Sequence, residues 1–201
     1  MTVTERYQQT IVLPRAVQFP VEMLRPEGFE EDRLETWPKV TGRLECVEGR
    51  LLYMPPCEDL QQDTVTDVVV ALGAWSREHR DFVLGTNEAG MRLNDATRAA
   101  DAAIWRRADL GAYTDGVRRV PPVLAVEVAG EDEPEPMLMR KASWYLDAGV
   151  EVVWIVLPES RELVVVDAAG QTRLTTAAAS PQHASLPGLA LRVADLFVQI
   201  S

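Results

Sequence analysis

Two carboxylates interrupt two apolar segments of the chain. Asp101 lies in the run from Ala99 to Trp105, and Glu127 lies in the run from Pro121 to Gly130. Short apolar runs bounded by Pro, Gly or charged residues predict strands that are covered on both faces. Burial of an unpaired carboxylate is unfavourable, so such a group needs a cation, hydrogen-bond donors or a metal. We therefore expect Asp101 and Glu127 to meet in one site.

A lysine is placed to join these carboxylates. A helix is expected at about residues 137–148, and in it Lys141 shares one face with Met137, Tyr145 and Ala148. Apolar residues adjoin this face, which indicates that it packs on the sheet. A lysine directed inward needs a carboxylate or another anion. We therefore expect Lys141 to reach Asp101 and Glu127.

These three residues suit metal-assisted chemistry on a phosphate. Two carboxylates on neighbouring strands can bind Mg²⁺ through oxygen and leave positions for water. The backbone carbonyl of Val128, beside Glu127, is a natural further ligand. A bound metal polarises a phosphate oxygen and acidifies its water, and Lys141 can stabilise the charge of the transition state. The structural alternative is that the carboxylates accept backbone amides at strand ends and that Lys141 forms an ion pair.

Periodicity and turn residues predict the elements that position the site. The expected order begins with a short helix at Glu27–Trp37, a hairpin of Arg43–Val47 and Arg50–Met54 around Glu48-Gly49, and a long helix at Asp59–Arg80. A second hairpin of Phe82–Leu84 and Gly90–Leu93 follows, and then come the strands around Asp101 and Glu127 and a helix at about Met137–Ala148 that is ended by Gly149. The last expected elements are strands at Val150–Leu157 and Glu162–Val166 and a strand within 186–193 that leads into a short helix at Ala194–Val198. This order predicts an α/β fold with a mixed sheet flanked by helices, as one domain at 26–201 after an irregular segment at 1–25.

Composition narrows the class of protein. The 201 residues suffice for one domain with a sizeable core. No apolar stretch reaches the roughly 20 residues of a membrane span, and Met1–Gln9 lack the pattern of a signal peptide. Cys46 and Cys57 do not have a metal-binding spacing, and two free thiols fit a reducing compartment. We therefore expect a cytoplasmic protein without a membrane partner.

The formal net charge of −11 argues against a protein that coats nucleic acid, because phosphate contacts need clustered Lys and Arg. It leaves room for a nuclease with a local basic cleft and a divalent metal. The candidate phosphate-contacting arginines are Arg92, Arg98, Arg106, Arg107, Arg118, Arg119 and Arg140.

The order of the motifs resembles the PD-(D/E)XK nuclease superfamily and, within it, the Uma-type restriction endonuclease family. The family's hairpin pattern Y-E-L-I-D-G-E, followed by M-P-P, corresponds to Leu44–Arg50 followed by Met54–Pro56. Its R-P-D-V strand corresponds to Ala99–Ala102, and its V-V-E-V-L-S strand corresponds to Ala125–Gly130. Its K-x-x-x-Y-x-x-A-G-V-x-x-Y-W-I-V pattern corresponds to Lys141–Val156. Together these motifs run from about residue 25 to the end of the chain.

The resemblance implies a restriction-endonuclease-like mixed β-sheet core flanked by helices, with an N-terminal β-hairpin extension. It also implies an endonuclease that uses Mg²⁺, or Mn²⁺, to hydrolyse phosphodiester bonds of DNA. Many enzymes that cut two strands are dimers, so a homodimer is expected.

The resemblance also implies roles for single residues. Lys141 takes the catalytic role of the signature lysine, because Ala129 occupies the usual lysine position. Asp101, Glu127 and Glu45 are implied as catalytic carboxylates. The implied metal ligands are Asp101, Glu127, the carbonyl of Val128, and Glu45 on the hairpin.

Three features depart from the family pattern. Ala100 stands in place of the proline before the strand Asp, and Gln61 stands where the family often has His. Gly130–Glu133 replaces a Ser-Pro-Ser segment and brings three acidic residues toward the site. Like charges there oppose the binding of DNA. A second hypothesis is therefore a catalytically degenerate nuclease fold that acts as a binding or regulatory module, and a third is a hydrolase of another phosphate ester.

Overall fold

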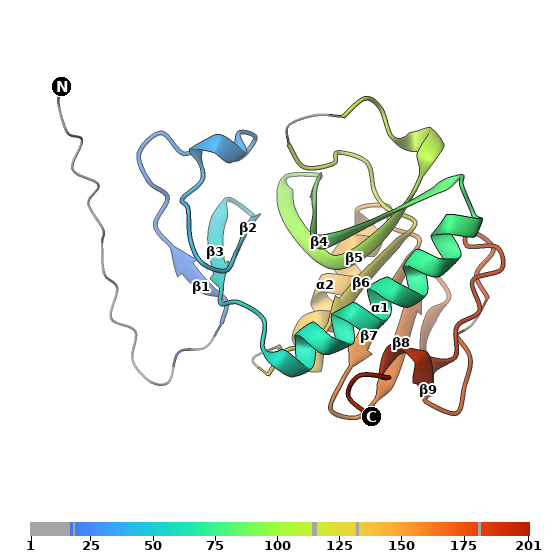
Figure 1. Ribbon diagram of the computed structural model, residues 1–201. Helices are drawn as coiled ribbons and strands as arrows, with labels where there is room; N and C mark the ends of the chain where they lie inside the picture. The colour runs from blue at the N-terminus through green and yellow to red at the C-terminus, as the bar shows by residue number, and fades with distance from the viewer. Residues whose placement is uncertain (1–16, 18, 114–115, 132, 181) are drawn as a thin grey trace, which may run out of the picture.

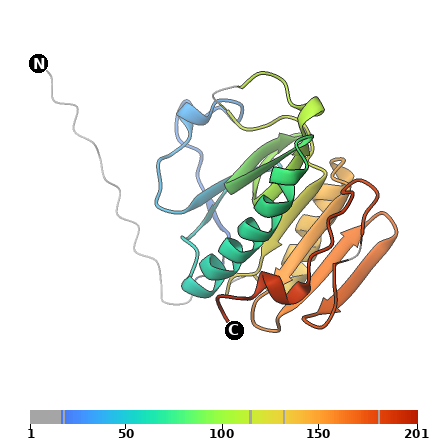
Figure 2. The same ribbon diagram turned by 45° about the vertical axis from the view of Figure 1, so that its right-hand side comes forward.

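The computed structural model describes residues 17, 19–113, 116–131, 133–180 and 182–201. Within these residues, nine strands form one mixed β-sheet, and a long helix lies on each face (Figures 1 and 2). The strands are β1 (Val21–Met23), β2 (Arg43–Val47), β3 (Arg50–Met54), β4 (Phe82–Leu93), β5 (Ala96–Arg106), β6 (Leu124–Val128), β7 (Val152–Leu157), β8 (Glu162–Asp167) and β9 (Gly170–Thr175). The helices are α1 (Asp59–Glu78) and α2 (Glu135–Asp147), with 3₁₀ helices at Leu34–Thr36, Arg107–Asp109 and Val193–Leu196. The predicted α/β class with helices flanking a mixed sheet is confirmed.

Strand β5 is the branch point of the sheet. Strand β4 pairs along one edge of β5 over nearly its whole length. On the other edge, β6 pairs with residues 102–104, whereas β2 pairs only at Thr97. Two neighbours therefore diverge from a single edge, and residues 98–101 of β5 lie between them. Figure 1 shows the N-terminal strands β1, β2 and β3 at the left of the view, where β2 joins them to the sheet through β5.

The sheet separates two apolar cores, and this explains the uninterrupted apolar run of β6. Leu124, Val126 and Val128 belong to the core on the α1 side, whereas Ala125 belongs to the core on the α2 side. Side chains alternate between the faces of a strand, so Glu127 is directed toward α2. A strand buried on both faces needs apolar residues on both. Glu127 is therefore the one charged exception within β6.

The N-terminal hairpin has the predicted bounds. Glu48 and Gly49 join β2 to β3 with φ of 50° and 73°, the pair of positive values that a type I′ turn requires. Strand β1 adds to the outer edge of β3. It lies in the segment 1–25, which we expected to be irregular and of which residues 1–16 and 18 lie outside the described part.

Both long helices are confirmed with small changes at their ends. Helix α1 begins at Asp59 as predicted, and α2 begins at Glu135, two residues before the predicted start. Gly149 follows α2 with a φ of 95°, as expected of a residue that ends a helix. No helix in the described part of the chain is long and apolar enough to cross a membrane.

Several local predictions are wrong. The predicted helix Glu27–Trp37 is reduced to the 3₁₀ turn at Leu34–Thr36, because Gly28 has a positive φ of 76° that no right-handed helix accommodates. The segments Phe82–Leu84 and Gly90–Leu93 do not pair with each other. They belong to the single long strand β4, in which a bulge between Thr86 and Ala89 mimics a turn in the sequence.

The C-terminal part also differs from the prediction. Strand β9 was not predicted, because it is a largely exposed edge strand with few apolar residues. In place of the expected strand within 186–193, Leu186 and Arg192 make isolated bridges to His183 and Ala179, with a turn at Pro187 and Gly188 between them. The expected helix at 194–198 is the 3₁₀ helix Val193–Leu196, which packs beside α1.

Candidate active site

The branch point of the sheet brings the sequence-predicted residues together. Glu45 comes from β2, Asp101 from β5 and Glu127 from β6. Lys141 comes from α2, on the inward face predicted by its helical phase, and contacts Glu127 and Glu45, whereas the cation within ion-pair distance of Asp101 is Arg43 and not the expected Lys141. All four predicted residues are buried, with exposed fractions between 1% and 5%. Buried charges require partners, so the pairing of these side chains decides what the site can do.

Glu127 is held by two donors from α2. Lys141 Nζ donates to Oε2 at 2.6 Å, and the Tyr145 hydroxyl donates to Oε1 at 2.6 Å. Lys141 and Tyr145 are one helical turn apart, so both face the strand. Burial acts to lower the pKa of Lys141, but the charges of Glu127 and Glu45 outweigh burial and raise that pKa. Lys141 is therefore a charged donor at neutral pH and not a base.

Asp101 is bound to the neighbouring strand. Its Oδ2 accepts the backbone N–H of Val128 at 2.7 Å, and its Oδ1 lies 3.8 Å from Arg43 Nη1. Burial, with the nearby charge of Glu127, raises the pKa of Asp101 to about 7. Arg43 and the Val128 amide act in the opposite direction but do not compensate. Asp101 thus has Arg43 as an ion-pair partner at 3.8 Å, which is too long to offset the effect of burial on its pKa.

Glu45 is partly unsatisfied. Its Oε2 accepts from Arg98 Nη1 at 3.1 Å, whereas Oε1 lies 3.6 Å from Lys141 Nζ and 3.9 Å from Arg43 Nε. Burial acts to raise the pKa of Glu45, but Lys141, Arg43 and Arg98 together lower it. The carboxylate is therefore ionised at neutral pH, and its buried Oε1 has no hydrogen-bond donor.

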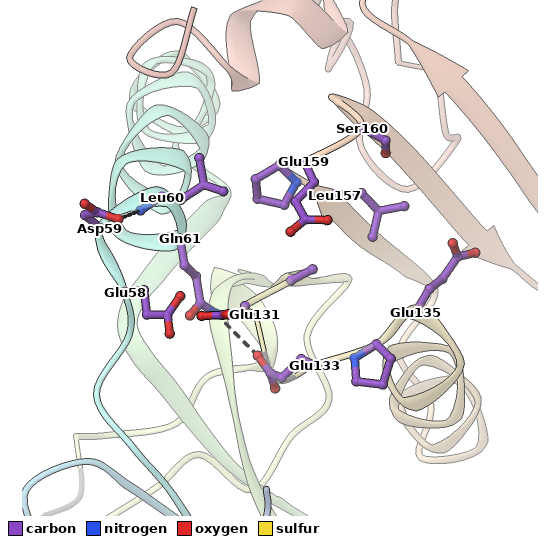
Figure 3. A pocket seen from close by; sticks show the side chains of 14 residues that line it. Glu58, Asp59, Leu60, Gln61, Glu131, Glu133, Glu135, Leu157, Glu159 and Ser160 are labelled. Carbon is purple, nitrogen blue, oxygen red and sulfur yellow. Dashed lines mark hydrogen bonds between the residues drawn. The ribbon is translucent and has the colours of Figure 1, made fainter. Parts of the chain in front are cut away.

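Arg43 and Glu133 complete the cluster, and neither was predicted as a site residue. Arg43 Nη2 donates to Glu133 Oε1 at 3.3 Å, and the buried Arg43 Nε has no hydrogen-bond partner. Gln61 Nε2 donates to the Val128 carbonyl at 2.7 Å and to Glu133 Oε2 at 3.4 Å (Figure 3). The predicted metal ligand Val128 O is therefore engaged by the residue that replaces the family's His.

The sequence contains a signal for one of these residues. Arg43 precedes Glu45 by two positions in a predicted strand, and residues two apart lie on the same face. Glu133 gives no such signal, because it belongs to a loop without periodicity. Of the acidic loop 131–135, Asp132 lies outside the described residues. Of the seven candidate arginines, Arg98 is the one that contacts a predicted site residue in the described part, through Glu45.

The chemistry of the donors suits a hard divalent cation. Carboxylate and carbonyl oxygens are the ligands that Mg²⁺ prefers, and Glu45 Oε1 is a buried carboxylate oxygen without a donor. Among the described residues, however, no three acidic, His or Cys side chains already form a metal cage. The guanidinium of Arg43 faces both Glu45 and Asp101. Binding of a cation therefore requires Arg43 to shift.

A small pocket of about 40 Å³ is lined by Arg43, Gln61 and Glu133, and two larger clefts also reach the cluster from outside. One of about 420 Å³ lies between α1 and the bulge of β4, and Asp101, Glu88 and Cys57 are among its lining residues. The other, of about 520 Å³, is lined by Gln61 and Glu133 and by the ends of β6 and β7 (Figure 3). A ligand can therefore approach the cluster beside Asp101 or beside Glu133.

Comparisons with known proteins agree with this architecture. The model of the Uma2 family, described as "Putative restriction endonuclease", matches residues 30–194. The fold is similar to the crystal structure of a "putative nuclease belonging to DUF820" from Anabaena variabilis ATCC 29413, with a TM-score of 0.76 and 15% sequence identity. The similarity covers 86% of this chain and 99% of that chain. No match was found among curated proteins. The predicted restriction-endonuclease-like fold is thus confirmed, and the chain belongs to the Uma2 family.

Proposed function

We propose that this protein is a Mg²⁺-dependent endonuclease that hydrolyses phosphodiester bonds of DNA. The observation that carries the proposal is the convergence of Glu45, Asp101 and Glu127 with the charged Lys141 at the branch point of the sheet. Membership of a nuclease-type family supports the same reaction. Mn²⁺ is expected to replace Mg²⁺, because both cations take oxygen ligands.

Asp101, Glu127, Glu45 and the carbonyl of Val128 would hold the cation through oxygen atoms. When bound, the cation supplies a more acidic water and neutralises charge on the phosphate. Lys141 Nζ donates to the negative charge that develops on the phosphate oxygens, and burial strengthens this interaction. Tyr145 fixes Glu127 through its hydroxyl and so positions the carboxylate for binding.

Protonation of Asp101 links this site to pH. The pKa of Asp101, raised to about 7 by burial and by Glu127, leaves part of the population protonated at neutral pH. A carboxylate binds a cation only when it is ionised, so cation binding releases a proton from this group. We therefore expect affinity for Mn²⁺ to rise between pH 6 and pH 8 by about tenfold, a change measurable by calorimetry at several pH values.

The test of the proposed function is cleavage of plasmid and linear DNA in the presence of Mg²⁺ or Mn²⁺. The variants Asp101→Asn and Lys141→Ala should each lower the rate by at least about a hundredfold. Asp95→Asn, which changes an exposed Asp in the turn between β4 and β5, is the control with the same chemical change. Cleavage that stays unchanged in both site variants would exclude this site.

A second function is favoured by a specific observation. Gln61 donates to the Val128 carbonyl and to Glu133, so this expected metal ligand is already engaged, and the chain carries a net charge of −11. A non-catalytic binding module that retains the nuclease fold would have this arrangement. It predicts no binding of Mn²⁺ by calorimetry and no cleavage, and saturable Mn²⁺ binding lost in Asp101→Asn would argue against it. Cleavage of other phosphate esters, but not of DNA, would favour the third hypothesis, a hydrolase of another phosphate ester. The expected homodimer stays a prediction.

A further inference from the structure

One buried carboxylate of the site is held only by long contacts, from donors that also bind other groups of the site. Glu133 Oε1 lies 3.3 Å from Arg43 Nη2 and 4.0 Å from Lys141 Nζ, and its Oε2 accepts from Gln61 Nε2 at 3.4 Å. Glu133 comes from the loop between β6 and α2, and its exposed fraction is 7%. A loop carboxylate is thus placed inside the site, against two cations and an amide.

These donors form the kind of pocket that binds a phosphate group. A planar guanidinium, an ammonium and a side-chain amide together recognise tetrahedral oxyanions. The contacts to Glu133 are long, and the buried Arg43 Nε has no acceptor at all. The two charged oxygens of a phosphodiester are farther apart and tetrahedrally arranged, unlike the planar pair of a carboxylate, so they can reach donors that Glu133 leaves unpaired.

The charges of the site point in the same direction. When Asp101 is ionised, the cluster apart from Glu133 has three carboxylates and three cations, namely Glu45, Asp101 and Glu127 with Arg43, Arg98 and Lys141. Glu133 adds one negative charge to this balanced set. The phosphodiester group that links two nucleotides also carries one negative charge. An exchange of the Glu133 carboxylate for this group therefore leaves the buried net charge unchanged. Such an exchange avoids the large cost of burying an additional charge.

We propose that Arg43, Gln61 and Lys141 form the subsite for the scissile phosphate, and that the Glu133 carboxylate occupies this subsite until a phosphate displaces it. The identity of the anion as a phosphodiester rests on the proposed nuclease function. The anion chemistry itself rests on the three donors. Glu133 is therefore an internal competitor of the substrate, and Arg43 is a binding residue that the known motif pattern does not include.

The loop allows Glu133 to leave without unfolding a helix. Strand β6 ends at Val128 and α2 begins at Glu135, so Glu133 belongs to neither element. Its backbone N–H is held by a single local hydrogen bond to the Gly130 carbonyl at 3.1 Å. The cleft of about 520 Å³ beside Gln61 and Glu133 provides space for the displaced side chain (Figure 3).

The test measures the binding of inorganic phosphate and of a short labelled DNA duplex in Ca²⁺. Glu133→Gln removes the charge and keeps the shape of the side chain, and it should bind both anions about five to ten times more tightly than the wild type. Glu131→Gln is the matched control, because it removes the same charge from an exposed position two residues earlier. We expect this control to change either affinity by less than about twofold.

Arg43 variants identify the donor. In the Glu133→Gln background, Arg43→Gln should abolish the gain in phosphate affinity. Arg43→Lys retains the buried charge but loses the forked donor, and it should retain less than half of the gain. Arg43→Lys also keeps the test decisive if Arg43→Gln does not fold, because the buried carboxylates then keep a cation. Circular dichroism and thermal unfolding establish that each variant used is folded.

Four outcomes of these measurements decide between the subsite, an effect of overall charge, a metal-ligand role of Glu133, and the nuclease reaction. Equal gains in Glu133→Gln and Glu131→Gln would overturn the proposal, because the effect would then be one of overall charge. A loss of Mn²⁺ affinity in Glu133→Gln without a gain for phosphate would make Glu133 a metal ligand and overturn it too. A gain for phosphate with no cleavage by any variant would retain the subsite and reject the nuclease. Cleavage without the gain would retain the nuclease and reject the subsite.

Discussion

The two sides of the site differ in how closely their charges are held. On the α2 side, both oxygens of Glu127 accept hydrogen bonds at 2.6 Å, one from Lys141 and one from Tyr145. On the hairpin side, the shortest contact of Arg43 with a carboxylate is 3.3 Å, and its contacts with Glu45 and Asp101 are 3.9 Å and 3.8 Å. The unpaired buried atoms Arg43 Nε and Glu45 Oε1 are both on this second side.

This difference follows from the elements that carry the residues. Strand β6 and helix α2 are fixed by the central sheet and by an apolar core on their shared face. Strand β2 joins the central sheet by a single pairing of Cys46 with Thr97, and Glu133 belongs to a loop. A rigid half and an adaptable half therefore meet in one site. The rigid half can hold transition-state donors in place, and the adaptable half can accommodate a cation and a substrate.

The largest effect should come from breaking the rigid half. Lys141→Met leaves the buried Glu127 without its cation, whereas Glu45 keeps Arg98 and Arg43, and it should lower the free energy of unfolding by about 3–5 kcal/mol. Glu133→Gln, on the adaptable side, should change it by less than about 1 kcal/mol. Urea unfolding measures both, and Lys39→Met is the control at the chain's other, exposed lysine. Equal losses in Lys141→Met and Glu133→Gln would show that the two sides are held alike.

Removal of the tyrosine hydroxyl tests the second donor of the rigid half. Tyr145→Phe leaves Glu127 Oε1 buried without its hydrogen bond and should cost about 1.5–3 kcal/mol, the range for hydrogen bonds to charged groups. Tyr53→Phe is the matched control, because the Tyr53 hydroxyl donates to the neutral carbonyl of Thr41 at 2.9 Å near the surface. A cost for Tyr145→Phe no greater than that for Tyr53→Phe would mean that Glu127 finds another donor.

The pH dependence of stability tests Asp101, which lies between the two halves. Burial and Glu127 raise its pKa to about 7 from an ordinary value of 3.8, so the folded state binds more protons than the unfolded state between these values. This group therefore stabilises the fold most at low pH, and its contribution is lost as pH rises through about 7. Asp101→Asn removes this titration. From pH 5 to pH 8, its free energy of unfolding should therefore rise relative to that of the wild type by on the order of 2 kcal/mol.

Thermal unfolding at several pH values measures this difference. Asp95→Asn, in the exposed turn, should follow the wild type at every pH. A difference between Asp101→Asn and the wild type that is constant with pH would mean that Arg43 holds Asp101 ionised. The hairpin side would then be as closely paired as the α2 side.

The same division separates what the sequence predicts from what it does not. Glu127 is evident as a charge in an apolar strand, and Lys141 and Tyr145 are evident from one helical turn of spacing. Both signals are periodic, so they can be recognised in the sequence alone. The role of Glu133 depends on how a loop folds back, and the branch point depends on two strands that share one edge of β5. Sequence periodicity carries no information on either.

Misassigned elements have the same origin. Asn87 and Glu88 interrupt the apolar pattern of β4 with positive φ values of 57° and 58°, so a bulge in one long strand has the sequence of a turn. The hairpin of β2 and β3 and the starts of α1 and α2 were predicted well, because turn and end signals are local. The fold therefore places Glu45, Asp101, Glu127 and Lys141 near one another as expected, and their roles stay a prediction, whereas Arg43 and Glu133 required the fold.

The smallest effect should come from Gly130→Ala, which disturbs the adaptable half through Gln61. A Cβ at Gly130 would lie 2.9 Å from Gln61 Oε1, so the amide must rotate away from the Val128 carbonyl that it now contacts at 2.7 Å. Because this amide ends a flexible side chain, the cost should be below about 1 kcal/mol in urea unfolding. Gly111→Ala, with no atom within 4 Å of its added Cβ, is the control. A loss in Gly130→Ala as large as that of Lys141→Met would mean that Gln61 cannot move, and the hairpin side would then be as rigid as the Glu127 side.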